Sequence, residues 1–275
     1  MTTDQAPLIQ TEKLSKTFSR EGVQQHVLRN LDLEIREGDF TVVMGSSGAG
    51  KSTLLYALSG IDTPTLGEVR FKGRSLVGLS QSELARFRRR ACGFVFQQIN
   101  LLETLSLFDN AMAAGLLVSK DRAAVAARAD ELFERVGIDP ATRRKLPAQT
   151  SGGEAQRAAV VRALVNSPDV LFADEPTGAL DQASGTAVLD LLSAVRAEGQ
   201  TVVMVTHDLK SARRGDRVVY LRDGQVAGEL DLRAALAGAV PAGRDGADAG
   251  TAAKAEAARA ARDDALRSFL IEMGW

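Results

Sequence analysis

The chain is organised around one stretch, Phe40-Thr-Val-Val-Met-Gly-Ser-Ser-Gly-Ala-Gly-Lys-Ser-Thr-Leu-Leu55. Its apolar beginning, Phe40 to Met44, predicts a buried strand, and the residues after the loop favour a helix from Lys51 to Leu58. The loop between them fits the pattern G-x-x-x-x-G-K-[ST], whose fixed places are taken by Gly45, Gly50, Lys51 and Ser52. An ordinary glycine-rich turn rarely matches all four places, so the stretch indicates a nucleotide triphosphate site.

Each part of this loop has a chemistry that suits phosphate. Glycines let the backbone fold tightly and aim its N–H groups at a phosphate chain, and the positive end of the helix dipole points to the same place. Lys51 adds a positive charge for the β- and γ-phosphates, and Ser52 offers a hydroxyl to Mg²⁺. We therefore expect a nucleoside triphosphate and Mg²⁺ as cofactors. The expected nucleotide-binding residues of the loop are Gly45, Ser46, Ser47, Gly48, Ala49, Gly50, Lys51, Ser52 and Thr53.

Two acidic residues, Asp174 and Glu175, end a second apolar run that begins at Val170. Asp174 is expected to hold the shell of Mg²⁺, and Glu175 is expected to orient or deprotonate a water. Acids at strand ends are usually only solvated, and it is the pairing with Lys51 and Ser52 that favours a catalytic role. His207 also ends an expected strand, where a capping or surface position is the alternative to a contact with phosphate.

The composition is that of an ordinary globular protein with a proper core, because the 275 residues are 45% hydrophobic and 25% charged. The net charge of -1 gives no electrostatic reason to expect nucleic acid as a partner. No apolar run approaches the roughly 20 residues that span a bilayer, and Met1 to Pro7 lacks a signal-peptide pattern, so we expect a cytoplasmic protein. The single cysteine, Cys92, is better interpreted as a buried inert thiol than as a reactive one.

Strands alternate with helices along most of the chain, and polar residues stand at the carboxyl ends of the strands, which predicts an α/β fold with a mostly parallel sheet. Strands are expected over 8–19, 25–35, 67–73, 93–97, 170–175, 201–206, 218–221 and 225–227, the last two joined by a tight turn at 223–224. Helices are expected over 51–58, 82–90, 151–166 and 185–197. From Asn100 to Leu146 helical spacing without a strand signal indicates a helical insertion.

One further motif, Thr150-Ser-Gly-Gly-Glu-Ala-Gln-Arg157, resembles the signature motif of ABC-transporter ATPases. In the order of that family stand the phosphate loop, Gln97 as the Q-loop, Val170 to Pro176 as Walker B, Gly178 to Asp181 as the D-loop and His207 as the H-loop. The resemblance covers roughly residues 8–228. Within the family the chain looks most like the lipoprotein-release, macrolide-export and peptide-antibiotic-resistance ATPases, with the cell-division ABC ATPase nearby.

The resemblance implies a P-loop NTPase core with a mostly parallel sheet, an antiparallel β subdomain and a helical insertion. It implies ATP hydrolysis with Glu175 and His207 as catalytic residues, and a metal site made by Ser52, Gln97 and Asp174. It also implies a head-to-tail homodimer, in which each ATP faces the Ser151, Gly152 and Gly153 of the opposite subunit, at a helix start with free N–H groups. Asp181 and Phe18 would also contact nucleotide, although Phe18 is almost as well interpreted as a core residue.

The resemblance further implies an ATP-hydrolysing subunit that powers a separately encoded integral-membrane permease of the export or lipoprotein/antimicrobial-release type, at the inner face of the cell membrane. A regulatory, non-transport role through a membrane partner, as in cell division, stays open as an alternative. A soluble ABC ATPase for DNA repair or translation usually carries coiled coils, zinc modules or two cassettes, and the sequence shows none of these. Thr150 replaces the usual leucine and Glu154 the commoner glutamine, which puts nucleotide affinity rather than activity in question.

The expected domains are an ABC ATPase domain over residues 1–230, with a helical subdomain over 98–160, followed by a linker and a C-terminal amphipathic helix over 231–275. Residues 239–250 read as the flexible part of the linker. The last helix carries an apolar stripe that would cover either its own cassette or a partner. The segment from Gln97 to Asn110 carries more apolar residues than a short connector needs, namely Ile99, Leu101, Leu102, Leu105, Leu107 and Phe108. Some of them are expected to pack inside the domain, and the others are expected to be exposed for permease docking.

Overall fold

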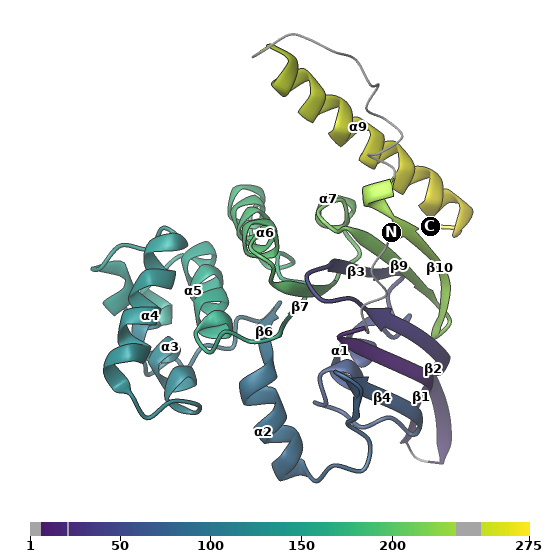
Figure 1. Cartoon of the computed structure of the whole chain (residues 1–275), viewed down its shortest axis with the longest axis horizontal. Coiled ribbons are helices and arrows are strands. Elements are labelled where there is room, and N and C mark those ends of the chain that lie inside the picture. Colours follow the sequence, from purple (N-terminus) through teal and green to yellow (C-terminus); the bar gives the residue numbers. More distant parts are fainter. Residues whose placement is uncertain (1–6, 21, 235–248) are drawn as a thin grey trace.

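The computed structural model describes residues 7–20, 22–234 and 249–275. A six-stranded sheet forms its centre, in the order β10-β9-β3-β8-β7-β6 (Figure 1). The strands of this sheet are β3 (Phe40–Gly45), β6 (Cys92–Phe96), β7 (Val170–Asp174), β8 (Thr201–Val205), β9 (Arg217–Arg222) and β10 (Gln225–Asp231). All residues of β3, β7 and β8 are buried, as expected for parallel strands that are covered on both faces.

The predicted hairpin between the last two strands is present, since β9 and β10 pair antiparallel around Asp223 and Gly224. Both turn residues have positive φ, +52° and +76°, which is the backbone that an Asp-Gly pair adopts in the tightest hairpins. The other neighbouring strand pairs of this sheet are parallel. The predicted mostly parallel sheet is therefore confirmed, with one antiparallel strand at its edge.

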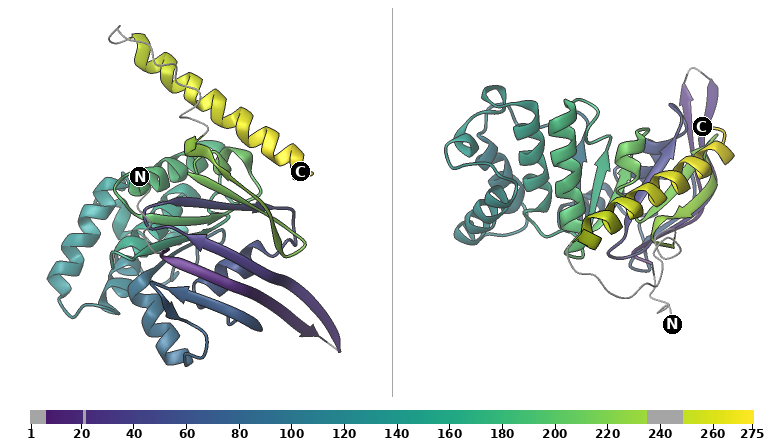
Figure 2. Two further views of the ribbon diagram at one scale, coloured as in Figure 1. Left: turned by 45° about the vertical axis from the view of Figure 1, so that its right-hand side comes forward. Right: turned by 90° about the horizontal axis from the view of Figure 1, so that it is seen from above.

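An antiparallel sheet stands against the central one, in the order β2-β1-β4-β5 (Figure 2). Its strands are β1 (Ile9–Arg20), β2 (Val23–Ile35), β4 (Leu66–Phe71) and β5 (Arg74–Ser75). Helix α1 (Lys51–Leu58) contributes to the buried cluster that joins the two sheets, in which Leu54 and Leu58 lie with Leu14, Leu31 and Val203. Glu21, between β1 and β2, lies outside the described residues.

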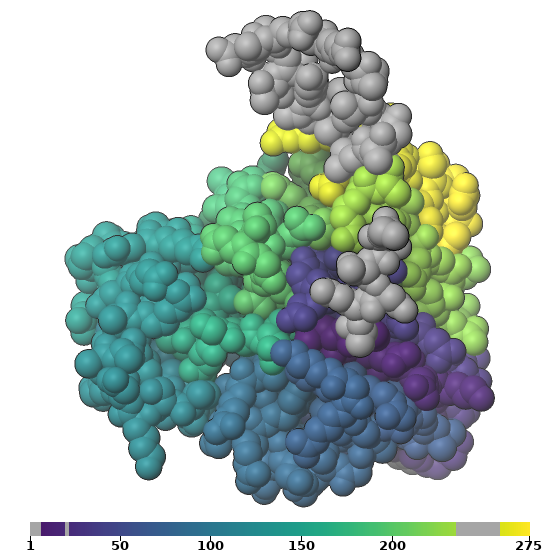
Figure 3. Space-filling model, viewed as in Figure 1, coloured from purple at the N-terminus to yellow at the C-terminus, as the bar shows by residue number. Residues whose placement is uncertain are grey.

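The helical insertion is also present and forms a lobe beside the sheets (Figure 3). Its helices are α3 (Leu107–Leu116), α4 (Arg122–Arg135) and α5 (Gly152–Leu164), with short 3₁₀ turns η1 (Thr142–Arg144) and η2 (Pro147–Gln149). The other helices of the cassette are α2 (Gln81–Ala91), α6 (Gln182–Ala197) and α7 (Leu209–Ala212). Phe108 and Phe133 of the lobe lie in the same buried cluster as Val42 of β3, so the core of the lobe continues the core of the central sheet.

Side-chain caps fix where most of these helices begin. Ser80, Ser106, Asp121, Ser151, Asp181 and Asp208 each accept a hydrogen bond from a backbone N–H of the helix that follows. The cap at Asp181 explains why α6 begins at Gln182, three residues before the start expected from the sequence. The cap at Ser106 places Leu107 and Phe108 inside the first turn of α3.

The segment from Gln97 to Asn110 packs partly inside the domain, so only some of its apolar residues are exposed. Leu101, Leu107 and Phe108 are buried, with exposed fractions of 7%, 0% and 6%. The first turn of α3 directs Leu107 and Phe108 into the core of the lobe, and Leu101 of the preceding loop packs in the same cluster. Leu102 is 56% exposed. Ile99 and Leu105 are half-buried.

The C-terminal helix α9 (Ala249–Glu272) lies across the β9–β10 hairpin (Figures 1 and 2). Its predicted stripe faces the cassette, since Leu266, Phe269 and Leu270 are buried there and Met273 packs beside them. Gly228 of β10 allows this approach, because a Cβ there would lie 2.8 Å from Met273 Sδ. The stripe therefore covers its own cassette, and residues 239–248 of the expected linker lie outside the described residues.

Candidate functional site

The phosphate loop has the backbone that its glycines permit. Gly45, Gly48 and Gly50 have φ values of +152°, +79° and +97°, which only glycine adopts without strain. At Gly45 a Cβ would collide with the carbonyl of Leu221 in β9, and at Gly50 it would lie 2.9 Å from the carbonyl oxygen of Val27 in β2. Gly50 begins α1 without a side-chain cap, so the first N–H groups of the helix are left for another acceptor.

Lys51 points back over this loop. Its Nζ donates to the carbonyl oxygens of Gly45 and Ser46, both at 2.9 Å. Burial lowers the pKa of Lys51, while the nearby charges of Glu175 and Asp174 act in the opposite direction. The amine is thus held at the phosphate loop, close to the carboxylates of Asp174 and Glu175.

A hollow of about 660 Å³ adjoins the loop. One wall is the loop itself from Ser46 to Ala49, and the others come from β2 and from the turn between β9 and β10. Phe18 on β1 is 43% exposed, with Lys16 Nζ at 5.0 Å from its ring centroid, so the core position that the sequence left open for Phe18 is excluded. An exposed ring on this strand is free to stack on a flat ligand.

Asp174 lies at the end of β7, facing α1. Ser52 Oγ donates to Asp174 Oδ1 at 3.0 Å, and Tyr56 OH donates to Asp174 Oδ2 at 3.1 Å. Burial raises the pKa of Asp174, whereas the hydrogen bonds from Ser52 and Tyr56 lower it. The contact between Ser52 and Asp174 was expected, and Tyr56 is a participant that the sequence pattern missed.

Glu175 follows directly and faces β8. His207 Nδ1 lies 2.8 Å from Glu175 Oε1, and Thr206 Oγ1 donates to Glu175 Oε2 at 3.3 Å. The backbone of Glu175 has a φ of +46°, which is uncommon outside glycine, and its N–H is bonded to the Val205 carbonyl at 3.0 Å. The two expected catalytic residues therefore meet, because parallel β7 and β8 end side by side.

Gln97 follows β6, the next strand along the sheet, and lies against Gly178, where a Cβ would be 2.9 Å from Gln97 Nε2. Gln156 of α5, like Tyr56, was given no role by the sequence analysis. It is 1% exposed, and its Nε2 donates to the carbonyls of Phe96 at 3.1 Å and Pro176 at 2.8 Å. The helix that carries the signature motif is thus bonded to the end of β6 and to the segment that follows β7.

The signature residues lie apart from the phosphate loop of the same chain. A Cβ at Gly152 would lie nearest to Leu180, just before α6, and a Cβ at Gly153 would lie nearest to Ser184 of α6 and then to Arg157 of α5. Ser151 caps α5 in a reciprocal box with Glu154, whose carboxylate accepts from Ser151 N at 2.8 Å and from Ser151 Oγ at 3.0 Å. These bonds lower the pKa of Glu154. Because Glu154 completes the capping box, this departure from the family pattern stabilises the start of α5.

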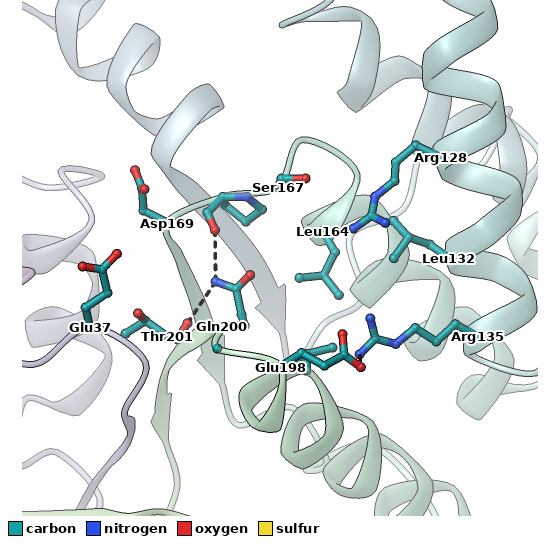
Figure 4. A pocket seen from close by; sticks show the side chains of 13 residues that line it. Glu37, Arg128, Leu132, Arg135, Leu164, Ser167, Asp169, Glu198, Gln200 and Thr201 are labelled. Atoms are coloured by element: carbon teal, nitrogen blue, oxygen red, sulfur yellow. Dashed lines mark hydrogen bonds and ion pairs between the residues drawn. The ribbon is translucent and has the colours of Figure 1, made fainter.

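A separate hollow of about 340 Å³ lies at the opposite, amino-terminal ends of β7 and β8 (Figure 4). Most of its charged side chains are already engaged, since Arg135 pairs with Glu198, Arg128 with Glu131 at 2.8 Å and Asp169 with Lys72 at 2.6 Å. Gln200 Nε2 donates to the Pro168 and Thr201 carbonyls at 3.0 and 3.2 Å. The loop and acid residues described above are therefore the better candidate site.

Fold and site together define a class, a P-loop nucleotide hydrolase with an inserted helical lobe and a signature helix. The chain belongs to the ABC transporter family, whose sequence model matches residues 28–178. It is 41% identical over 219 residues to an uncharacterized ABC transporter ATP-binding protein of Methanocaldococcus jannaschii, across 80% of this chain and 97% of the relative. It is 44% identical over 222 residues to the macrolide export ATP-binding/permease protein MacB 1/2 of Paracoccus denitrificans, across 80% of this chain.

Only 33% of that macrolide-export relative is matched, so the chain spans about a third of its length. Among solved structures, an ATP-binding cassette described as a dimer in a post-hydrolysis state with ADP and Pi superposes with a TM-score of 0.76. That cassette is 37% identical and is covered over 99% of its length, against 82% of this chain. The chain is thus an ATP-binding cassette with ATPase activity, and its predicted fold class is confirmed.

Proposed function

We propose that this chain hydrolyses Mg²⁺-ATP as one half of a head-to-tail homodimer and so powers a separate integral-membrane permease of the export type. The observation that carries the proposal is the convergence of Ser52, Asp174, Glu175 and His207 at the carboxyl ends of β7 and β8, beside the phosphate loop. The signature residues lie apart from it, so each chain supplies two incomplete half-sites. Relatives named for macrolide and pyoverdine export support the direction of transport.

The residues present fit a magnesium ion. Mg²⁺ prefers oxygen ligands and is usually bound by one or two carboxylates together with substrate phosphates. Ser52 Oγ and Asp174 Oδ1 form such an oxygen pair, 3.0 Å apart, with Gln97 as the third expected contact. When bound with ATP, the ion would neutralise charge on the phosphates.

The chain's own residues account for the other requirements. The loop N–H groups and Lys51 would bind the phosphates, and the helix dipole of α1 adds to the same field. Glu175, held by His207 and Thr206, would accept the proton of an attacking water. Phe18 would stack on the adenine ring of ATP. Asp181, as the cap of α6, would hold the D-loop backbone near the nucleotide.

The homodimer can be tested at Gly152, because a Cβ there would meet only Leu180 Cδ2 at 3.5 Å and the isolated chain has room for a side chain. With ATP, Glu175→Gln should elute as a dimer in light scattering. Adding Gly152→Glu should keep it monomeric, since the new charge would face γ-phosphate across the interface. Ala127→Glu, on the exposed face of α4, is the matched control and should still dimerise. Equal dimerisation of the Gly152→Glu chain would contradict this interface.

The permease is proposed to dock beside Gln97. Leu102 is exposed there on a loop that the buried Asn110 side chain fixes, through bonds of 2.7 and 3.1 Å to Leu102 N and O. Next to it lie a hollow of about 450 Å³ near Leu101 and Thr150, and one of about 370 Å³ lined by Phe94, Phe96 and Leu117. An exposed Leu102 beside hollows that combine apolar side chains with Arg88, Arg89 and Arg162 suits a cytoplasmic segment of a membrane protein. The chain would then lie at the cytoplasmic face of the membrane through this partner.

Co-expression with the candidate permeases of its own genome tests this docking. Leu102→Asp should lose co-purification with the cognate permease or stimulation of ATPase activity by it, while the variant still folds and binds ATP. Ile271→Asp, at a site that is 74% exposed on α9, introduces the same charge elsewhere and should have no effect. Normal assembly of the Leu102→Asp chain would remove this loop from the docking surface. Assembly without substrate movement would instead favour the regulatory, cell-division-like role.

A further inference from the structure

Helix α1 bonds both carboxylate oxygens of Asp174. Ser52 Oγ bonds Oδ1 at 3.0 Å, and Tyr56 OH bonds Oδ2 at 3.1 Å. Residues four apart lie on one face of a helix, so Ser52 and Tyr56 stand one above the other and reach the same strand end. Two donors from one rigid element leave the carboxylate group a single orientation.

The tyrosine itself is well anchored. Its ring packs against the buried cluster between the two sheets, and its hydroxyl alone extends to Asp174. The Tyr56 carbonyl also accepts from the N–H groups of Ile61 and Asp62, at 2.9 and 3.1 Å, which fixes the end of α1. A rotation of Asp174 about its terminal bond would break the Tyr56 bond, and the anchored ring could not follow.

We propose that Tyr56 is a positioning residue of the metal site, whose hydroxyl holds Asp174 Oδ2 so that Oδ1 and Ser52 Oγ together face the magnesium nucleotide. This inference rests on the proposed function, in which Ser52 and Asp174 hold Mg²⁺. Tyr56 does not touch the nucleotide in this account; it acts through Asp174. Residues that orient metal ligands commonly change metal affinity about tenfold or more when they are removed.

The test is Tyr56→Phe in the full chain, because this change removes only the hydroxyl and keeps the packed ring. Binding of a fluorescent ATP analogue is titrated with MgCl₂, and the Mg²⁺ concentration at half-saturation is measured. We expect it to rise about tenfold, whereas analogue binding in EDTA should not change. With Mn²⁺ in place of Mg²⁺, the electron paramagnetic resonance spectrum of the bound ion should broaden, which loss of packing alone would not cause.

The matched control is Tyr220→Phe, the same chemical change at the other tyrosine of the chain, which is buried in β9 at 3% exposure. It should leave the Mg²⁺ midpoint unchanged. Tyr56→Leu, which also loses the ring, should raise the midpoint as much as Tyr56→Phe and lower stability in addition. A Tyr56→Phe chain with the unaltered midpoint and Mn²⁺ spectrum would overturn the proposal while leaving the magnesium site standing. An unaltered chain that binds the analogue equally with and without Mg²⁺ would remove the metal site and the proposal together.

Discussion

His207 Nδ1 lies 2.8 Å from Glu175 Oε1, so the histidine after β8 bonds the acid after β7. Glu175 is held from three sides, because Thr206 bonds its other oxygen and the Val205 carbonyl bonds its N–H. The histidine is 69% exposed at its side chain, whereas the glutamate is only 16% exposed. The acid is therefore fixed by the protein, whereas its histidine partner remains accessible to solvent.

Removal of the histidine should release this acid. For His207→Ala we expect ATP affinity close to that of the unaltered chain and hydrolysis lower by about a hundredfold, because a preorganised polar group at the reacting phosphate is lost. His207→Gln, which retains a side-chain donor, should keep more activity than His207→Ala. Phosphate release measured at saturating ATP separates the two. Full activity in His207→Ala would exclude His207 from the catalytic group.

The positive charge of the phosphate loop should control binding. In Lys51→Ala the charge-assisted contacts to phosphate disappear, and we expect ATP affinity to fall by about ten- to a hundredfold, with no turnover and an intact fold. Calorimetric titration with ATP measures the affinity. Lys72→Ala, which removes a half-exposed lysine paired with Asp169 at 2.6 Å, is the control and should bind normally. Unchanged affinity and hydrolysis in Lys51→Ala would count decisively against its role.

The sequence was sufficient for those parts of the site that a motif encodes in consecutive residues. Lys51 and Ser52 stand in a fixed pattern, and Asp174 and Glu175 end an apolar strand, so their meeting follows from parallel strands that end at one edge of a sheet. Tyr56 and Gln156 were missed because their partners lie across the fold and no spacing rule names them. The pair Ser106 and Asp109, an available helix-start signal, would have shown that Leu107 and Phe108 turn inward.

The position of the C-terminal helix α9 could not be predicted from the sequence either. Leu266, Phe269 and Leu270 are spaced as one helical face, but spacing cannot name the surface that a helix covers. The answer depends on Gly228, whose missing side chain makes room for Phe269 and Met273. Only the folded hairpin brings that glycine under α9.

Docking of α9 predicts a contrast between neighbouring residues. Leu270 is 1% exposed and Ile271 is 74% exposed. We expect Leu270→Ala to lower the free energy of unfolding by about 2–4 kcal/mol, and Ile271→Ala to change it by less than about 0.5 kcal/mol. Urea denaturation followed by circular dichroism and by Trp275 fluorescence measures both. Similar values for the two variants would contradict the docked position of α9.

The buried Cys92 is predicted to be unreactive in the folded chain. Burial raises the pKa of the Cys92 thiol well above its ordinary range, so the reactive thiolate is disfavoured throughout the neutral and mildly alkaline range. We expect almost no reaction of the folded chain with a thiol-specific reagent at pH 8, and one equivalent of reaction after unfolding in urea. Rapid labelling of the folded chain would show that Cys92 is accessible, contrary to its 9% exposure.

The most direct test of the central claim compares steady-state phosphate release by the full chain and by Glu175→Gln, with ATP binding measured in parallel. Glutamine has the shape of glutamate and can keep the contacts to His207 and Thr206, but it cannot accept the proton of water. We expect Mg²⁺-dependent ATP hydrolysis by the unaltered chain, and a loss of at least about a hundredfold in Glu175→Gln with ATP binding retained. Turnover close to normal in Glu175→Gln, with ATP bound, would contradict the assignment of Glu175 as the base.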